Sequence, residues 1–224
     1  MHGEQIRLLL VEDSAALGKA LVFAFEFEDG IEPVGVAPTI RKALEMVAGE
    51  KPDVVLMDVR LPDGSGIDAV SRVLELRPET SVIVMTAHAD NLMALDAADA
   101  GAAGFILKDV RIAKIVAGVR RAVTEALAVD NVMLQAVLTQ ATATASAGVE
   151  LSASQSEVAS LLAEGLDRQA IAARLAITED EVTVMAAALR EHLGARSNLE
   201  AVVKAARAGL FGPDQGSKAR ISNR

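Results

Sequence analysis

Short apolar runs alternate with amphipathic stretches along the first half of the chain. Runs with the length and composition of buried strands lie at 6–11, 32–36, 54–57, 82–85 and 104–107. Stretches with apolar residues at helical spacing follow them, near 14–28, 40–50, 66–77, 91–100 and from 111 onward. Strands that alternate with helices indicate a parallel sheet covered on both faces. We therefore predict an α/β fold with a doubly wound, five-stranded parallel sheet.

The second half has no strand pattern. Its apolar spacing predicts short helices near 154–164, 168–175, 179–193 and 198–208. Thr178 followed by Glu181 three residues later is a capping box, which marks the start of the third of these helices. A helix, a tight turn and a second helix are typical of a helix-turn-helix, so we predict a small all-α domain of that kind.

These patterns divide the chain into four segments. Asp130 or Asn131 is expected to begin a linker helix, and the Ala, Thr and Ser tract at 141–148 is expected to be a flexible joint. The polar tail is expected to be disordered. The predicted segments are the first domain at 5–128, the linker helix and joint at 129–148, the helix-turn-helix domain at 149–211 and the tail at 212–224.

Composition excludes several classes of protein. The chain has no cysteine, so it carries no disulfide, thiolate nucleophile or Cys-based metal site, which suits a reducing cytosol. Its three histidines are scattered, and no Gly-rich loop ending in Gly-Lys-Ser/Thr is present. Neither a signal peptide nor an apolar stretch of the roughly 20 residues that a spanning helix needs is found. We expect a cytoplasmic protein that does not contact membranes and is not an enzyme.

The negative charge is concentrated in the first half. The formal net charge is −9, and residues 149–224 hold nine Lys and Arg against ten Asp and Glu, which leaves −8 for residues 1–148. An acidic domain repels nucleic acid, so only the second half is a candidate for binding DNA.

Candidate chemistry lies where the predicted strands end. Glu12, Asp13, Asp58, Thr86 and Lys108 follow four different strands, and the carboxyl ends of parallel strands meet at one edge of the sheet. Crowded carboxylates need a cation, and Mg²⁺ is the hard ion that prefers oxygen ligands and neutralises phosphoryl groups. The only acid that ends a fully apolar run and precedes a Pro-Asp-Gly turn is Asp58, which makes it the candidate nucleophile for an acyl phosphate. The hydroxyl of Thr86 and the ammonium group of Lys108 are suited to bind phosphoryl oxygens.

Residues 5–128 resemble the receiver domain of two-component response regulators. The motifs occur in the order that is typical of that family. They are Leu10-Val11-Glu12-Asp13-Ser14, Val55-Leu56-Met57-Asp58-Val59-Arg60-Leu61-Pro62-Asp63-Gly64, Val84-Met85-Thr86-Ala87 and Gly104-Phe105-Ile106-Leu107-Lys108-Asp109.

This resemblance implies phosphotransfer to Asp58 from a histidine kinase or a phosphotransfer protein. It implies Mg²⁺ held by Asp13, Asp58 and the backbone carbonyl of Arg60, with Glu12 helping through water. Lys108 then binds the phosphoryl group.

The resemblance also assigns roles outside the acidic cluster. Thr86 and Phe105 match the switch pair of the family, in which the hydroxyl moves to the phosphoryl group and the aromatic ring turns inward. Arg60 and His88 match positions that tune dephosphorylation.

The first predicted helix carries two apolar residues off its buried face. Phe23 and Phe27 are four residues apart, so they share a helix face, and we expect both to be partly exposed. By resemblance this helix docks the kinase, and the two rings are candidates for that contact.

Residues 151–211 resemble the LuxR-type output domain of the NarL/FixJ subfamily. The matching segments are Leu161-Leu162-Ala163-Glu164-Gly165-Leu166, Ile171-Ala172-Ala173-Arg174-Leu175, Leu193-Gly194-Ala195-Arg196-Ser197 and Ala201–Gly209. The resemblance implies a transcription regulator that binds DNA and forms a homodimer on phosphorylation.

The recognition helix departs from the family. At its outward positions Thr183 is polar, whereas Val184 and the neighbouring Met185, Ala187 and Ala188 are not, and three acids open the helix. Candidate DNA contacts are therefore Arg168, Arg174, Thr183, Val184, Arg190 and Arg196. Two alternatives remain: a DNA-binding regulator, or a domain that has lost DNA binding and acts through protein contacts.

Overall fold

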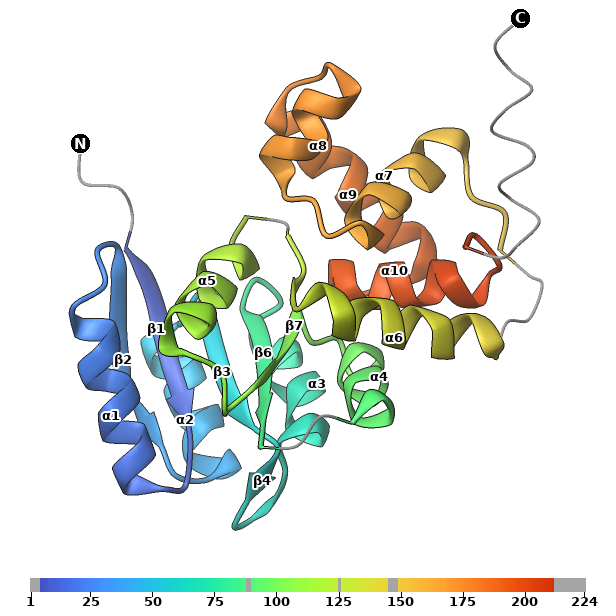
Figure 1. Cartoon of the computed structure of the whole chain (residues 1–224). Coiled ribbons are helices and arrows are strands. Elements are labelled where there is room, and N and C mark those ends of the chain that lie inside the picture. The colour runs from blue at the N-terminus through green and yellow to red at the C-terminus, as the bar shows by residue number, and fades with distance from the viewer. Residues whose placement is uncertain (1–4, 88–89, 125, 145–148, 212–224) are drawn as a thin grey trace, which may run out of the picture.

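The computed structural model of the chain describes residues 5–87, 90–124, 126–144 and 149–211. An α/β domain forms the N-terminal part and a group of helices forms the C-terminal part, with helix α6 between them (Figure 1). The predicted flexible joint at 141–148 was placed too early, because helix α6 continues to Ala143 and Ala141 is buried in it. The rest of the joint, 145–148, and the predicted tail at 212–224 lie outside the described residues.

The elements follow the predicted order. The strands are β1 (Ile6–Val11), β2 (Ile31–Ala37), β3 (Val54–Asp58), β4 (Arg60–Leu61), β5 (Gly64–Ser65), β6 (Ser81–Thr86), β7 (Gly104–Leu107) and β8 (Ala128–Val129). The helices are α1 (Ala15–Glu26), α2 (Ile40–Glu50), α3 (Gly66–Leu76), α4 (Asn91–Asp99), α5 (Ile112–Ala122), α6 (Asn131–Ala143), α7 (Ala153–Ala163), α8 (Arg168–Leu175), α9 (Glu179–Leu193) and α10 (Asn198–Arg207).

The main sheet is parallel with strand order β2-β1-β3-β6-β7-β8, and it holds six strands. The prediction of five strands was therefore wrong. The additional strand is β8, where Ala128 pairs with Gly104 and Val129 with Phe105. A run of two residues is too short to give a strand pattern, so tertiary pairing alone defines it. Strands β7 and β8 approach each other closely, because a Cβ atom at Gly104 would lie 2.4 Å from the carbonyl oxygen of Ala128.

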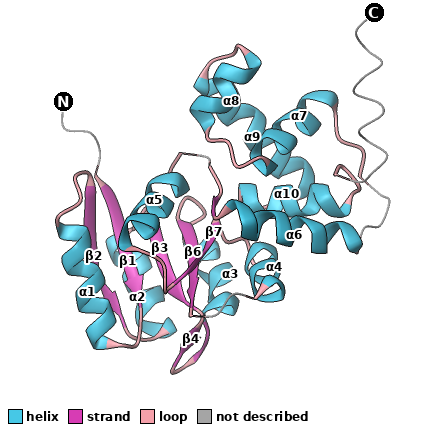
Figure 2. Cartoon of the chain, in the orientation of Figure 1, coloured by secondary structure: helices cyan, strands magenta, loops and turns pink. Residues whose placement is uncertain are grey.

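Helices cover both faces of the sheet, as predicted for a doubly wound fold (Figure 2). Helices α1 and α5 pack on one face, where Leu21, Phe25 and Val119 are buried. Helices α2, α3 and α4 pack on the other face, with residues such as Val47 and Val73. Both faces are covered, and this explains why every residue of β3 is buried and why its sequence is apolar up to Met57.

The four helices α7, α8, α9 and α10 occupy the ranges predicted for the helix-turn-helix domain to within one residue at each end. Helix α10 packs against α7 and α9 on one side and against α4 and α6 on the other. The apolar core of the α2/α3/α4 face is therefore continuous through α6 into the C-terminal helices. From Leu199 to Ala206 every residue except Lys204 is buried. The one acid among them, Glu200, is paired with Lys204 at 2.8 Å.

Helix α6 begins as the sequence predicts. Asp130 is its N-cap, and the carboxylate accepts a hydrogen bond of 3.0 Å from the backbone N–H of Val132. Leu134, Val137 and Leu138 are buried along the helix. Among the helices that the structure describes, none combines the length and the apolar character needed to cross a membrane.

Candidate functional site

Three carboxylates meet at the carboxyl edge of the sheet. Strand β1 leads directly into Glu12 and Asp13, and the adjacent β3 ends in Asp58. One oxygen from each carboxylate lies within 4.8 Å of the others. Glu12 and Asp58 are buried, at 2 % and 7 % exposure, whereas Asp13 is exposed. The parallel register thus assembles the acidic cluster that the sequence predicted, with one member open to solvent.

Lys108 lies between the two buried carboxylates. Its Nζ is 2.6 Å from Glu12 Oε2 and 2.7 Å from Asp58 Oδ2. Burial lowers the pKa of this lysine, but the hydrogen bonds and charges of Asp58 and Glu12 raise it more, so the net shift is upward. The ammonium group is therefore charged, and it satisfies two acids that would otherwise be buried without a counter-charge.

The charges of the site suit a divalent cation. Three carboxylates and one ammonium leave a formal net charge of −2 around a set of hard oxygen ligands. Backbone groups orient the acids, because Ser14 N donates to Glu12 Oε1 at 3.2 Å and Arg60 N donates to Asp58 Oδ1 at 3.3 Å. The donor set fits Mg²⁺, and Asp13 is the carboxylate of the set that is open to solvent.

Thr86 lies next to Lys108, and Phe105 lies on the strand that pairs with that of Thr86. Thr86 ends β6 with 4 % exposure, and its carbonyl oxygen accepts a hydrogen bond of 2.7 Å from Lys108 N. Phe105 is in β7, and its ring is buried at 3 % exposure in the core of the α2/α3/α4 face. The two predicted switch residues are thus on neighbouring strands, with Thr86 at the edge of the sheet that holds the carboxylates. Arg60 is exposed at the edge of the same site, and His88 lies outside the described residues.

The backbone after Asp58 is closely packed. A Cβ atom at Gly66, the first residue of α3, would lie 1.8 Å from the carbonyl oxygen of Asp58. Gly66 N also donates to Val59 O at 2.8 Å. Only glycine allows helix α3 to begin so near the candidate nucleophile.

Phe23 and Phe27 are exposed on α1, as predicted, at 63 % and 74 %. Their ring centroids are 4.9 Å apart in an edge-to-face arrangement. The pair forms a small aromatic surface on the outer side of the first helix.

The second candidate site is helix α9. The predicted capping box is confirmed: the Thr178 hydroxyl accepts a hydrogen bond from Glu181 N at 3.2 Å, and the Glu181 carboxylate accepts one from Thr178 N at 2.8 Å. The hydrogen bonds from Thr178 lower the pKa of Glu181. Val184 is 68 % exposed, and Thr183 uses its hydroxyl to donate to the carbonyl of Glu179 at 3.2 Å. The exposed positions in the middle of α9, at Val184, Ala187 and Ala188, are therefore apolar.

The four candidate arginines are in different environments. Arg174 is exposed on α8, and Arg168 pairs with Glu179 at 2.9 Å. Arg190 donates to Asn198 at 2.6 Å, and Arg196 lies 3.8 Å from the carboxylate of Glu200.

Two of these arginines are on the side of the helical domain that faces the sheet. Arg190 and Arg196 line a cleft of about 690 Å³ between the two domains. The structure thus places Arg168, Arg174 and Arg190 on the helix-turn-helix and Arg196 just after it, and of these four Arg190 and Arg196 line the interdomain cleft.

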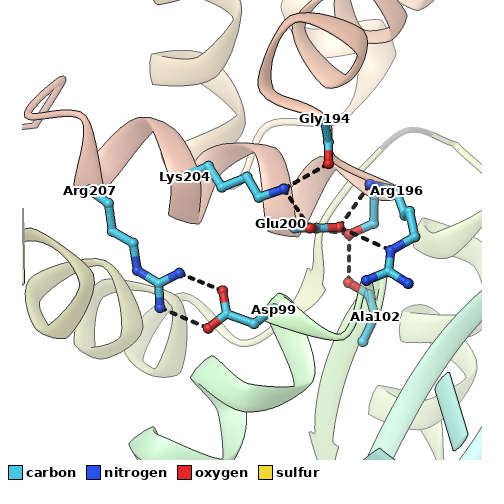
Figure 3. Close-up of polar contacts among 8 residues, drawn as sticks. Asp99, Ala102, Gly194, Arg196, Glu200, Lys204 and Arg207 are labelled. Atoms are coloured by element: carbon cyan, nitrogen blue, oxygen red, sulfur yellow. Dashed lines mark hydrogen bonds and ion pairs between the residues drawn. The ribbon is translucent and has the colours of Figure 1, made fainter. Parts of the chain in front are cut away.

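Several contacts were not found from the sequence. Ser197 Oγ donates to the carbonyl of Ala102 at 2.8 Å, and Arg207 pairs with Asp99, so α10 is joined to the α/β domain by polar contacts (Figure 3). The carboxylate of Asp63 caps helix α2. These residues have no local signal, because their partners lie 22 or more positions away in the chain.

Two family profiles match the chain, each over one domain. The profile described as "Response regulator receiver domain" matches residues 8–120. The profile described as "Bacterial regulatory proteins, luxR family" matches residues 149–205.

Similar proteins cover nearly the whole chain. It is 28 % identical over 201 residues to the DNA-binding transcriptional activator DevR/DosR of Mycobacterium tuberculosis (strain ATCC 25618 / H37Rv). The matched region covers 88 % of this chain and 93 % of that protein. It is 30 % identical over 215 residues to the probable transcriptional regulatory protein NarL of the same strain, over 93 % and 97 % of the two chains. The solved signal receiver domain of the putative response regulator NarL from Mycobacterium tuberculosis matches with 30 % identity and a TM-score of 0.51, over 53 % of this chain and 95 % of that one.

Proposed function

We propose a residue-level mechanism for this chain, which belongs to the two-component response regulators that join a receiver domain to a LuxR-type DNA-binding domain. Members of this family are transcriptional regulators rather than enzymes. The alternative of an output domain that has lost DNA binding is not favoured, because relatives that match over almost the full chain are transcriptional regulators.

The observation that carries the mechanism is the position of Lys108 between Glu12 and Asp58, at 2.6 Å and 2.7 Å. We assign Asp58 as the phosphoacceptor. A carboxylate oxygen of Asp58 attacks phosphorus on the phosphohistidine of a histidine kinase or phosphotransfer protein. An O–P bond forms as the donor N–P bond breaks, and the imidazole nitrogen leaves with that electron pair. Lys108 then exchanges a carboxylate partner for a phosphoryl oxygen.

We assign the metal ligands to Asp13, Asp58 and the backbone carbonyl of Arg60, with Glu12 acting through water. Bound there, Mg²⁺ would neutralise charge on the phosphoryl group in the transition state. The net charge of −2 and the mixture of buried and exposed carboxylates support this assignment.

We assign the conformational response to Thr86 and Phe105. The hydroxyl of Thr86 would bind a phosphoryl oxygen, and the inward position of Phe105 would be retained when Thr86 moves toward Asp58. Their adjacent strands and burial support the pairing. Arg60 is exposed at the mouth of the site, which suits a role in admitting water for dephosphorylation. The same role for His88 stays a prediction.

We assign the kinase contact to Phe23 and Phe27. Two rings packed edge to face on an exposed helix face form an apolar surface that a partner helix can cover. Replacing both by serine should slow phosphotransfer from the kinase but leave loading by small phosphodonors unchanged.

The DNA contacts are assigned by position. Arg168, Arg174, Thr183 and Val184 lie on the helix-turn-helix, and we propose them as its first contacts. Arg190 and Arg196 line the interdomain cleft, so their use requires the two domains to separate. We further propose that phosphorylation favours a homodimer, and cytoplasmic localisation remains a prediction.

The test is binding of the full-length protein to a pool of genomic DNA fragments. The protein is compared unmodified and as the beryllofluoride adduct with Mg²⁺, at low and moderate salt. We expect the adduct to enrich specific fragments with a steep salt dependence, and we expect no gain for Asp58→Asn. An adduct that forms on Asp58 without enriching any fragment would contradict the assigned output.

A further inference from the structure

The segment that follows Asp58 is a small hairpin, β4–β5, fixed at its base to the sheet. Arg60 pairs with Ser65 and Leu61 with Gly64 in antiparallel register. At the base, Val59 N donates to the carbonyl of Met85 in β6 at 3.1 Å. The base of the hairpin therefore has its position set by the sheet.

The tip of this hairpin is attached to a different element, helix α2. Asp63 Oδ1 accepts a hydrogen bond from Ile40 N at 2.8 Å, and Oδ2 accepts one from Arg41 N at 3.0 Å. These N–H groups belong to the first turn of α2, where a helix has no partners of its own for them. The hydrogen bonds from Arg41 and Ile40 lower the pKa of Asp63, so the ionised carboxylate is the form that binds.

The tip of the hairpin is also closely packed against helix α2. Gly64 has a φ of +147°, and a Cβ atom there would lie 3.2 Å from Ile40 Cδ1. Asp63 shares the cap with Thr39, whose hydroxyl accepts from Lys42 N at 3.2 Å. Helix α2 thus has two side-chain caps, one local and one supplied by the hairpin.

Arg60 lies between the two attachments of the hairpin. Its backbone N–H contacts Asp58 Oδ1, and its carbonyl is the proposed metal ligand. A backbone carbonyl binds a cation well only where the surrounding chain holds it in place, since a mobile loop loses conformational entropy on binding. The tip contact removes that freedom before the ion arrives.

We propose that Asp63 is a positioning residue for phosphorylation of Asp58. By capping α2 it holds the hairpin, and with it the Arg60 carbonyl, in the geometry that the metal site uses. This inference rests on the proposed metal ligands, and the experiment separates the two.

The test measures Mg²⁺ affinity of the full-length protein by calorimetry for the wild type, Asp63→Ala and Thr39→Ala. Thr39→Ala is the matched control, because it removes a cap of the same helix without touching the hairpin. We expect Asp63→Ala to weaken Mg²⁺ binding by about tenfold, the lower end for residues that orient metal ligands. Thr39→Ala should change it less than about twofold.

A second readout needs no metal. Amide hydrogen exchange in the metal-free protein should rise at 60–64 in Asp63→Ala but not in Thr39→Ala. Asp63→Asn, which keeps one acceptor oxygen, should fall between the wild type and Asp63→Ala in both measurements. If Asp63→Ala does not fold, the comparison of Asp63→Asn with the wild type tests the proposal instead.

Asp13→Asn tests the proposed metal ligands separately from the positioning role of Asp63. If Asp13→Asn binds Mg²⁺ as the wild type does, the proposed metal ligands are wrong. If Asp13→Asn loses Mg²⁺ while Asp63→Ala and Thr39→Ala both match the wild type, the metal site stands and the role of Asp63 is overturned. Equal losses in Asp63→Ala and Thr39→Ala would also overturn it, because helix capping alone would then explain the effect.

Discussion

Asp99 and Arg207 join the two domains through a two-point ion pair at the C-terminal ends of α4 and α10. Arg207 Nη1 lies 2.6 Å from Asp99 Oδ1, and Nη2 lies 2.8 Å from Oδ2. This hydrogen bonding raises the pKa of Arg207. Because the two planar groups fit each other, the pair fixes the orientation of α10 on the receiver as well as its distance (Figure 3).

This pair should contribute measurably to stability. Its side chains are 32 % and 37 % exposed, so solvent screens part of the attraction. We expect a coupling free energy of about 0.5 to 1 kcal/mol from a double-mutant cycle of Asp99→Ala and Arg207→Ala. Denaturation followed by far-UV circular dichroism measures it, since the chain has no Trp or Tyr.

The exposed pair of Lys42 and Glu45 provides the comparison. These side chains are 52 % and 55 % exposed and form a single contact of 3.2 Å within one helix. Their coupling should be smaller, about 0.3 kcal/mol. Strictly additive effects of Asp99→Ala and Arg207→Ala would show that the interdomain pair adds no stability.

Glycine at position 66 is required by the phosphoacceptor segment. In Gly66→Ala the new methyl group would meet the carbonyl oxygen of Asp58 at 1.8 Å, so helix α3 must move away. We expect a loss of about 3 kcal/mol or more in unfolding free energy, the upper end for overpacking. The control is Gly49→Ala in α2, where nothing lies within 4 Å of the added atom. That change should stabilise the protein by up to about 1 kcal/mol, because alanine favours helix.

The elements with strong local patterns were predictable from the sequence. The run before Asp58 and the capping box of Thr178 and Glu181 depend on neighbouring residues, and the structure has both. Even the meeting of Glu12 and Lys108 follows from parallel strands that end at one edge.

Contacts that depend on three-dimensional position were not predictable. Strand β8 has only two residues, and its pairing is decided by where α5 returns the chain. The attachment of Asp63 to α2 joins positions that no periodicity relates. Placement of α10 against α4 likewise gives no signal in either helix alone. Tertiary packing sets all three.

The capping box predicts a dependence of stability on pH. The pKa of Glu181 is lowered below its usual 4.5 by the hydrogen bonds from Thr178. A group whose pKa is lower in the folded state stabilises the fold above its unfolded pKa, and this contribution is lost as the pH falls through the folded pKa. The stability difference between the wild type and Glu181→Gln should therefore be constant above pH 4.5 and shrink below it. A difference that does not change between neutral and acidic pH would contradict the role of the charge.

Lys108 should affect cation binding and phosphoryl binding in opposite directions. In the structure its ammonium group occupies the space between Glu12 and Asp58, where it offsets one of three negative charges. Removing it in Lys108→Ala leaves a formal charge of −3, so Mg²⁺ should bind more tightly, on the order of threefold to tenfold. The beryllofluoride adduct should weaken at the same time, because the cation that contacts the phosphoryl oxygens is lost.

Lys108→Arg is the control for charge, since it keeps the cation but changes its shape. It should leave Mg²⁺ affinity near the wild-type value and weaken the beryllofluoride adduct less than Lys108→Ala does. Calorimetric titration with Mg²⁺ and then with beryllofluoride measures both effects on one sample. If Lys108→Ala binds Mg²⁺ and beryllofluoride with equally reduced affinity, the lysine only maintains the structure of the site. If the two affinities change in opposite directions, the same ammonium group that bridges the resting carboxylates also receives the phosphoryl group.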